Sequence, residues 1–142
     1  MDPDNPVVKL CVKGMQAEAQ DRSDEALTFF MQAWEACKDD YDACIAAHFV
    51  ARHQENPQDM LYWNKESLIR ASAVGDERVQ MFYPSLYLNM GYSYELLGNV
   101  TEALRYYELA ASQADELPDG PYSETVRNGI ANGRKRVELM KP

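Results

Sequence analysis

The side chains best suited to chemistry fall in one short stretch that combines arginine, histidine, tryptophan and asparagine. Arg52 and His53 are adjacent, and Trp63 and Asn64 follow within about one helical hairpin. Arginine presents a planar fork of donors, so such a cluster could bind an anion or a small polar ligand. The alternatives are a buried hydrogen-bond network and plain surface exposure. The cluster is a candidate small-ligand site.

Cysteine and histidine could also act as metal ligands or nucleophiles. Cys44 and His48 are one helical turn apart, so on a helix both could face one ion. Zinc needs four ligands, or three plus water, and the sequence offers no second paired set. Cys11, Cys37 and Cys44 lack CxxC spacing, which is typical of reduced structural thiols. Because phosphate-loop, GxSxG and HExxH motifs are also missing, we expect no metal, no cofactor and no enzymatic activity.

Charge narrows the classes of partner. The chain has 142 residues and a net charge of −9, which repels phosphate backbones, so we expect no nucleic-acid partner. No apolar run approaches the roughly 20 residues that span a bilayer, and the first residues are acidic and proline-rich. We therefore expect no membrane association and a cytoplasmic protein. The sign of the charge reverses near the end, where the basic residues are Arg127, Arg134, Lys135, Arg136 and Lys141.

Two segments of the chain repeat one another at a constant offset. The match holds in residue type and in spacing together, which is the signature of a repeat architecture. The offset equals two periods of about 34 residues plus a short insertion, so a third unit is expected between the two. The matched pairs are Leu10 with Tyr87, Gly14 with Gly91, Ala17 with Tyr94, Glu25 with Glu102, Ala26 with Ala103, Leu27 with Leu104, Phe29 with Tyr106, Phe30 with Tyr107, and Ala33 with Ala110.

Close packing of paired helices explains these residue types. A glycine on the first helix lets the second approach, an alanine on the second receives it, and an aromatic residue fills the space beside them. The segment LNMGYSYELLGNVTEALRYYELA, residues 88–110, resembles the tetratricopeptide-repeat (TPR) motif, including the turn Gly98-Asn99. The first unit departs from the motif at Asp21, where glycine is favoured. The stretches AAHFVARHQENPQDMLYWN and FYPSLYLNMG are also similar to small bacterial TPR proteins with no established activity.

The resemblance implies an all-α fold, a right-handed α-solenoid of three helix pairs with a C-terminal capping helix, about seven helices in all. Gly75 favours a helix stop, and the residues after it read as one long helix that Pro84 should kink or interrupt. We expect one domain, 1–142, composed of a first repeat at 7–40, an irregular second repeat at 41–74, an insertion at 75–83 that extends the next helix, a third repeat at 84–117 and a capping helix at 119–141.

The second repeat is irregular in its first helix. An offset of one strict repeat period from Gly14 places His48 at the closely packed site, whereas a shift of one position places Ala47 there. The shifted register is sterically preferable because alanine is small.

TPR proteins usually bind peptides or partner helices along a concave groove, and the resemblance implies the same function here. A protein or peptide partner is therefore expected. The alternatives are self-association, as a homodimer, through aromatic residues such as Phe82, Tyr83 and Tyr87 or through the basic C-terminus, and binding of a small polar ligand at residues 52–64. The expected groove residues are Met15, Phe49, Arg52, Leu88, Asn89, Tyr92 and Glu95.

Overall fold

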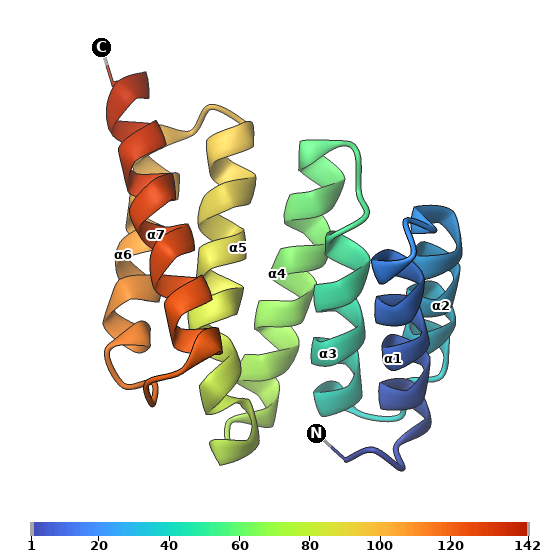
Figure 1. The fold of residues 1–142 in the computed structure, drawn as a ribbon. Coiled ribbons are helices and arrows are strands. Elements are labelled where there is room, and N and C mark those ends of the chain that lie inside the picture. Colours follow the sequence, from blue (N-terminus) through green and yellow to red (C-terminus); the bar gives the residue numbers. More distant parts are fainter. Residues whose placement is uncertain (1, 142) are drawn as a thin grey trace. The chain divides into compact units, whose positions relative to one another are not determined.

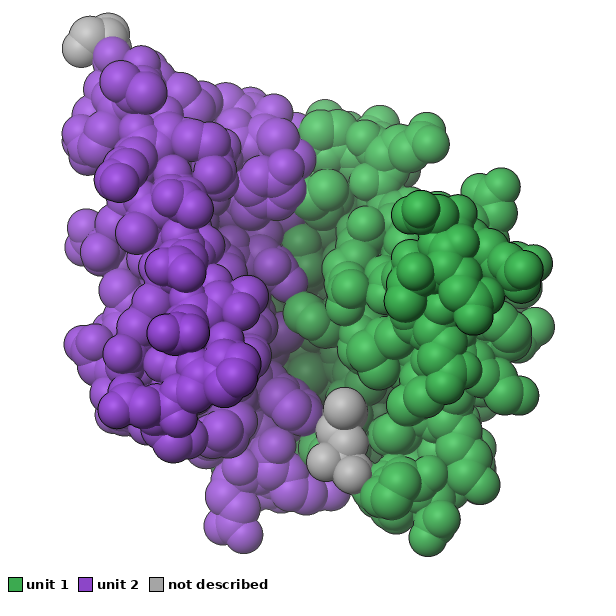
Figure 2. All heavy atoms as spheres, in the orientation of Figure 1, with its two compact units in different colours: residues 1–75 green, residues 76–142 purple. Residues whose placement is uncertain are grey.

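The computed structural model describes residues 2–141, and within them the fold is all-α (Figure 1). These residues form seven α-helices and one 3-10 helix, and they contain no strand, which confirms the prediction of an all-α fold. The chain divides into two compact units, residues 1–75 and 76–142, coloured green and purple in Figure 2.

Unit 1 contains four α-helices that run in alternating directions (Figure 1). Each helix packs against the next one in the chain, and the first also contacts the third. The helices are α1 (Pro6–Ala19), α2 (Ser23–Glu35), α3 (Asp40–Ala51) and α4 (Pro57–Val74).

Asparagine caps and prolines define where two of these helices begin. Asn5 accepts a hydrogen bond from the Val7 amide at 2.8 Å, and Pro6 opens α1, where a missing N–H costs nothing. Asn56 and Pro57 begin α4 in the same way. Gly75 ends α4 in the left-handed conformation, with φ of 64°, as the sequence predicted.

Unit 2 contains a 3-10 helix and three α-helices. Helices α5 and α6 pack against each other, and α7 packs against both. The buried side chains between them include Ala110, Ile130 and Val137, so α7 covers apolar surface of the preceding pair. The elements are η1 (Glu77–Phe82), α5 (Tyr83–Leu96), α6 (Val100–Ala114) and α7 (Pro121–Met140).

The segment predicted to extend the helix into α5 is instead a separate 3-10 helix, η1. The α-helix begins only at Tyr83, which places Pro84 in its first turn, where proline needs no hydrogen-bond partner. The 3-10 helix leads into α5 without an intervening residue, so the helix type changes just before Pro84.

Three local features recur in the two units at the offset seen in the sequence. The first is a close approach: a Cβ on Gly14 would lie 2.6 Å from Phe30 Cζ, and one on Gly91 would lie 2.8 Å from Tyr107 Cδ1. In both units a glycine and an aromatic ring on the following helix are therefore packed too tightly for any side chain at the glycine.

The second recurrent feature is a left-handed residue at the turn between two helices. Asp21 has φ of 58° and Gly98 has φ of 77°. Glycine adopts this conformation freely, whereas aspartate adopts it at a cost. The position that departs from the TPR motif in sequence thus keeps the backbone conformation that the glycine would have.

In the second helix pair, Ala47 is fully buried and His48 is partly exposed. This difference favours the shifted register, in which Ala47 occupies the closely packed site.

Candidate functional site

The third recurrent feature is a glutamate near the end of the first helix in each unit. In unit 1, Glu18 on α1 receives two side chains from the end of α3. Its Oε2 lies 2.6 Å from His53 Nε2, and its Oε1 accepts a 3.0 Å hydrogen bond from Arg52. The His53 ring stacks on Phe30, and the Arg52 guanidinium lies over Phe49. The contacts of Arg52 and His53 with Glu18 therefore connect the end of α3 to α1.

In unit 2, Glu95 on α5 is held in a similar way by α6 and α7. Its Oε2 accepts from Arg136 Nε at 2.7 Å, and its Oε1 accepts from the Tyr107 hydroxyl, also at 2.7 Å. Burial and the hydrogen bond to Glu95 raise the pKa of Tyr107, and that of Arg136 is raised by the same carboxylate. The Arg136 guanidinium also lies 5.8 Å from the centre of the Tyr92 ring. Charge and geometry thus lock α7 onto α5.

The two glutamates are related by the repeat offset, but one of the two side chains that bind each glutamate differs between the units. Tyr107 supplies a hydroxyl to Glu95, whereas the equivalent Phe30 has none, and His53 supplies the second contact to Glu18 instead. Glu18 and Glu95 were not predicted from the sequence as a pair, although the repeat offset aligns them. Each is a structural ion-pair centre within its own unit.

The candidate ligand cluster, Arg52, His53, Trp63 and Asn64, does not form one site. Two of its residues bind Glu18, and the other two lie on α4. Arg52 and His53 bind Glu18, as described above. Trp63 packs edge-on against Trp34 at 5.1 Å between centroids, and Asn64 is buried on α4. The observed contacts fit the alternative of a polar network better than an open ligand site.

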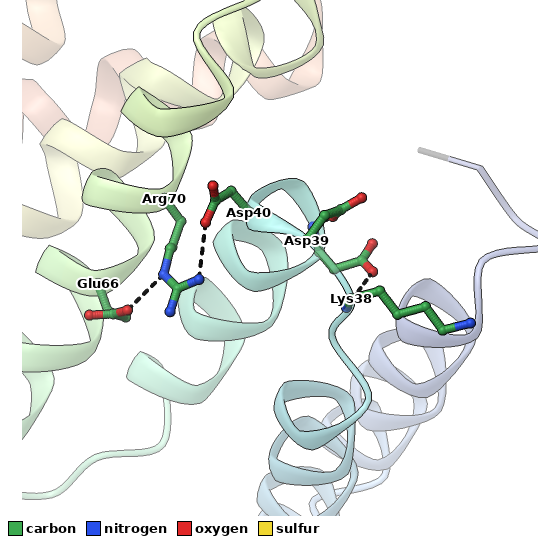
Figure 3. A network of polar contacts seen from close by, with 6 residues as sticks. Lys38, Asp39, Asp40, Glu66 and Arg70 are labelled. Atoms are coloured by element: carbon green, nitrogen blue, oxygen red, sulfur yellow. Dashed lines mark hydrogen bonds and ion pairs between the residues drawn. The ribbon is translucent and has the colours of Figure 1, made fainter.

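A hollow in unit 1 lies where α2, α3 and α4 meet, and it was not predicted from the sequence. Arg70 on α4 crosses it, donating to Glu66 at 2.8 Å and to Asp40 at 3.0 Å, while Lys38 extends away from Arg70 (Figure 3). Because two carboxylates already hold the guanidinium, an anionic ligand would have to displace them. The hollow has a volume of about 540 Å³ and is lined by Trp34, Cys37, Lys38, Asp39, Asp40, Ala43 and Arg70.

The thiols are poorly suited to nucleophilic chemistry. Burial raises the pKa of Cys11 and of Cys37 to about 12, and burial also raises the pKa of Cys44. The thiolate is the reactive form, so these groups are almost wholly protonated near neutral pH. The pair Cys44 and His48 gains no further ligand, since residues 2–141 hold no group of three or more histidine, cysteine or acidic side chains arranged for a metal ion.

The seven expected groove residues differ in accessibility. Phe49 and Glu95 are buried, and Leu88 packs against the apolar cores of unit 2. The remaining four are at least partly accessible, and two of those, Arg52 and Tyr92, are exposed. The buried Phe49 ring stacks on Phe30, with 5.0 Å between the ring centroids. Phe49, Leu88 and Glu95 thus stabilise the helix packing, while the accessible four are Met15, Arg52, Asn89 and Tyr92.

The tyrosines expected to support self-association contact other aromatic rings of unit 2. Tyr83 and Tyr87 have ring centroids 5.6 Å apart, and Tyr87 in turn contacts Tyr106. Tyr94 also stacks on Tyr106, with 5.7 Å between the ring centroids. The four rings form a continuous row along α5 and α6.

Exposed apolar side chains gather at one end of unit 2. Helices α5 and α7 finish at the same end of the unit (Figure 1), and Glu95 and Arg136 bridge them there. Five large apolar residues within about a turn of this bridge are between 37% and 87% exposed. We call this surface the end patch, and it consists of Tyr92, Leu96, Leu97, Leu139 and Met140.

Comparison with known proteins gave no match to a family model, to a curated protein or to a solved structure. None of the helices in the described part of the chain has both the length and the apolar character to cross a membrane. The class defined by the fold is therefore an all-α protein of seven α-helices over residues 2–141.

Proposed function

We propose that this chain is a TPR-type repeat protein, a right-handed α-solenoid that holds a protein or peptide partner and catalyses no reaction. The observation that carries the proposal is the recurrence of three structural features at one offset. Gly14 and Gly91 face aromatic rings, Asp21 and Gly98 share a left-handed turn, and Glu18 and Glu95 each bind a cation from a later helix. Repeat proteins of this kind offer binding surfaces.

The distribution of polar contacts supports binding over catalysis. The charged side chains best suited to chemistry are held in ion pairs inside their own units, and they are Glu18, Arg52, Arg70, Glu95 and Arg136. Exposed apolar side chains remain at the surface, as in the end patch. Such patches mark interaction sites in many proteins.

The groove positions suggest a direct test. Met15 on α1 and Tyr92 on α5 are equivalent at the repeat offset, and both are accessible. We expect the double variant Met15→Ala, Tyr92→Ala to lose partners that the wild type captures from native lysate, as measured by quantitative mass spectrometry. Tyr62→Ala is the matched control, because Tyr62 is an exposed aromatic residue on α4 outside the expected groove.

Capture that is equally strong for the wild type and the double variant would argue against these positions as the binding surface. Loss of capture in the Tyr62→Ala control as well would indicate a general loss of apolar surface rather than a specific site.

A further inference from the structure

The end patch combines apolar and cationic side chains in a regular arrangement. On α7, Lys135 lies one turn before Leu139, and Arg136 lies one turn before Met140. Residues four apart on a helix share a face, so each cation is beside an apolar side chain. On α5, the exposed Leu96 lies one turn after Tyr92.

The bridge between the helices fixes this arrangement in space. Arg136 joins Glu95 through two hydrogen bonds, of 2.7 and 3.2 Å, and its guanidinium also lies beside the Tyr92 ring. Arg136 of α7 is therefore held against Tyr92 and Glu95 of α5, which brings the ends of the two helices together. A surface fixed in advance loses little conformational freedom when it binds.

The acidic groups near the patch are already neutralised. Glu95 is occupied by Arg136, and Glu138 accepts from Lys141 at 3.1 Å. Lys135 is exposed, and it makes no ion pair with any of the described residues. The charge that the patch offers to a partner is consequently positive.

The rest of the chain has the opposite sign. After Gly120 there are five basic and two acidic residues, whereas the whole chain carries a net charge of −9. An acidic partner is repelled by most of the surface and attracted to this helix, while a basic partner is drawn to the acidic remainder. Such complementarity directs the encounter and excludes other partners.

We infer that the end patch is the docking site for an acidic amphipathic segment of another protein, whose large apolar side chains contact Leu139, Met140 and Leu96 while its carboxylates face Lys135. This inference rests on the proposed function and adds the location and chemistry of the partner. It requires binding that weakens as salt concentration rises, because surface charges are screened.

Selection of a random peptide library on phage against the full chain tests this inference. We expect the enriched peptides to carry net negative charge and to place large apolar residues three and four positions apart. The double variant Leu139→Ser, Met140→Ser should bind them at least tenfold more weakly, and Lys135→Glu several-fold more weakly. Because these side chains lie at the exposed end of the last helix, circular dichroism should show unchanged helicity.

Several outcomes would overturn the inference. Enriched peptides that are neutral or basic would do so, as would acidic peptides that bind the double variant as well as the wild type. A concentration-dependent dimer in sedimentation velocity, abolished by the same double variant, would assign the patch to a second copy of the chain instead.

The two proposals fail separately. If capture from lysate depends on Met15 and Tyr92 while the library yields no acidic peptides, the partner chemistry is wrong and the binding function stands. Because Tyr92 belongs to the end patch as well, the Met15→Ala change alone separates the two sites. If an acidic peptide binds the patch while capture is insensitive to Met15→Ala, the patch stands and the groove position is wrong.

Discussion

Replacing Gly133 with alanine tests how tightly α7 packs onto the rest of unit 2. A Cβ at this position would lie 2.7 Å from both Cε1 and the hydroxyl oxygen of Tyr107. The ring has no room to retreat, because a Cβ on Gly91 would meet the same ring at 2.8 Å. Tyr107 is fully buried between two glycine backbones, so the added methyl group forces the helices apart.

The expected magnitude follows from two opposing terms. Overpacking a core typically costs about 1–3 kcal/mol, and a rigid ring places this site at the upper end of that range. Alanine in a helix interior is favoured over glycine by about 1 kcal/mol. We therefore expect Gly133→Ala to lower the free energy of unfolding by about 2 kcal/mol.

Gly129 on the same helix provides the matched control. A Cβ there would lie 2.9 Å from Leu88 Cδ2, the flexible end of a side chain that can rotate away. Gly129→Ala should therefore leave stability almost unchanged, since the propensity gain offsets a small packing cost.

Urea denaturation followed by far-ultraviolet circular dichroism measures both variants under identical conditions. In a Tyr107→Leu background the cost of Gly133→Ala should shrink, because the ring that it strikes is gone. Equal stability of the two glycine variants, or an unchanged cost in the Tyr107→Leu background, would refute the proposed packing of α7.

Four further predictions follow from the structure. Asp21→Gly should stabilise the chain by about 1 kcal/mol in urea denaturation, because the residue has positive φ and glycine removes that strain; a loss of stability would contradict this. Glu95→Gln should cost about 2 kcal/mol, because Glu95 is 9% exposed and anchors Arg136; a double-mutant cycle with Arg136→Gln should show coupling between the two residues, and purely additive effects would count against the bridge. Burial and the neighbouring arginine lower the pKa of His48 to about 4. The unfolded chain therefore binds a proton that the folded chain does not, and the free energy of unfolding should fall as pH drops from about 6.5 towards 4. His48→Gln should flatten this pH dependence, and an identical pH dependence in both proteins would be evidence against it. Cys37, whose pKa is raised to about 12, should react with iodoacetamide at pH 8 roughly a thousandfold more slowly in the folded chain than in urea; comparable rates in the two conditions would show that the thiol is not protected.

The helical fold was predictable because the strongest signals are local or periodic. Gly91 and Tyr107 are a small and a large residue at a spacing that only paired helices bring together, and Gly14 and Phe30 repeat the pattern. The stop at Gly75 was predictable from its own conformational preference.

The polar contacts were not predictable to the same degree. Whether His53 faces a ligand or Glu18 depends on how α3 packs against α1, which the local sequence does not determine. The burial of Phe49 depends on the same packing. The segment at Glu77–Phe82 forms a 3-10 helix that leads directly into α5, and the sequence alone left the choice between a kink and a break at Pro84 open.

Hydrogen–deuterium exchange of the full chain, with and without a partner recovered from lysate, tests the binding proposal most directly. The groove proposal predicts slower amide exchange around Met15 on α1 and Tyr92 on α5 when the partner is bound, and the end patch adds slower exchange in residues 134–141 at the end of α7. Protection confined to α2 or α4, or no change anywhere, would contradict it.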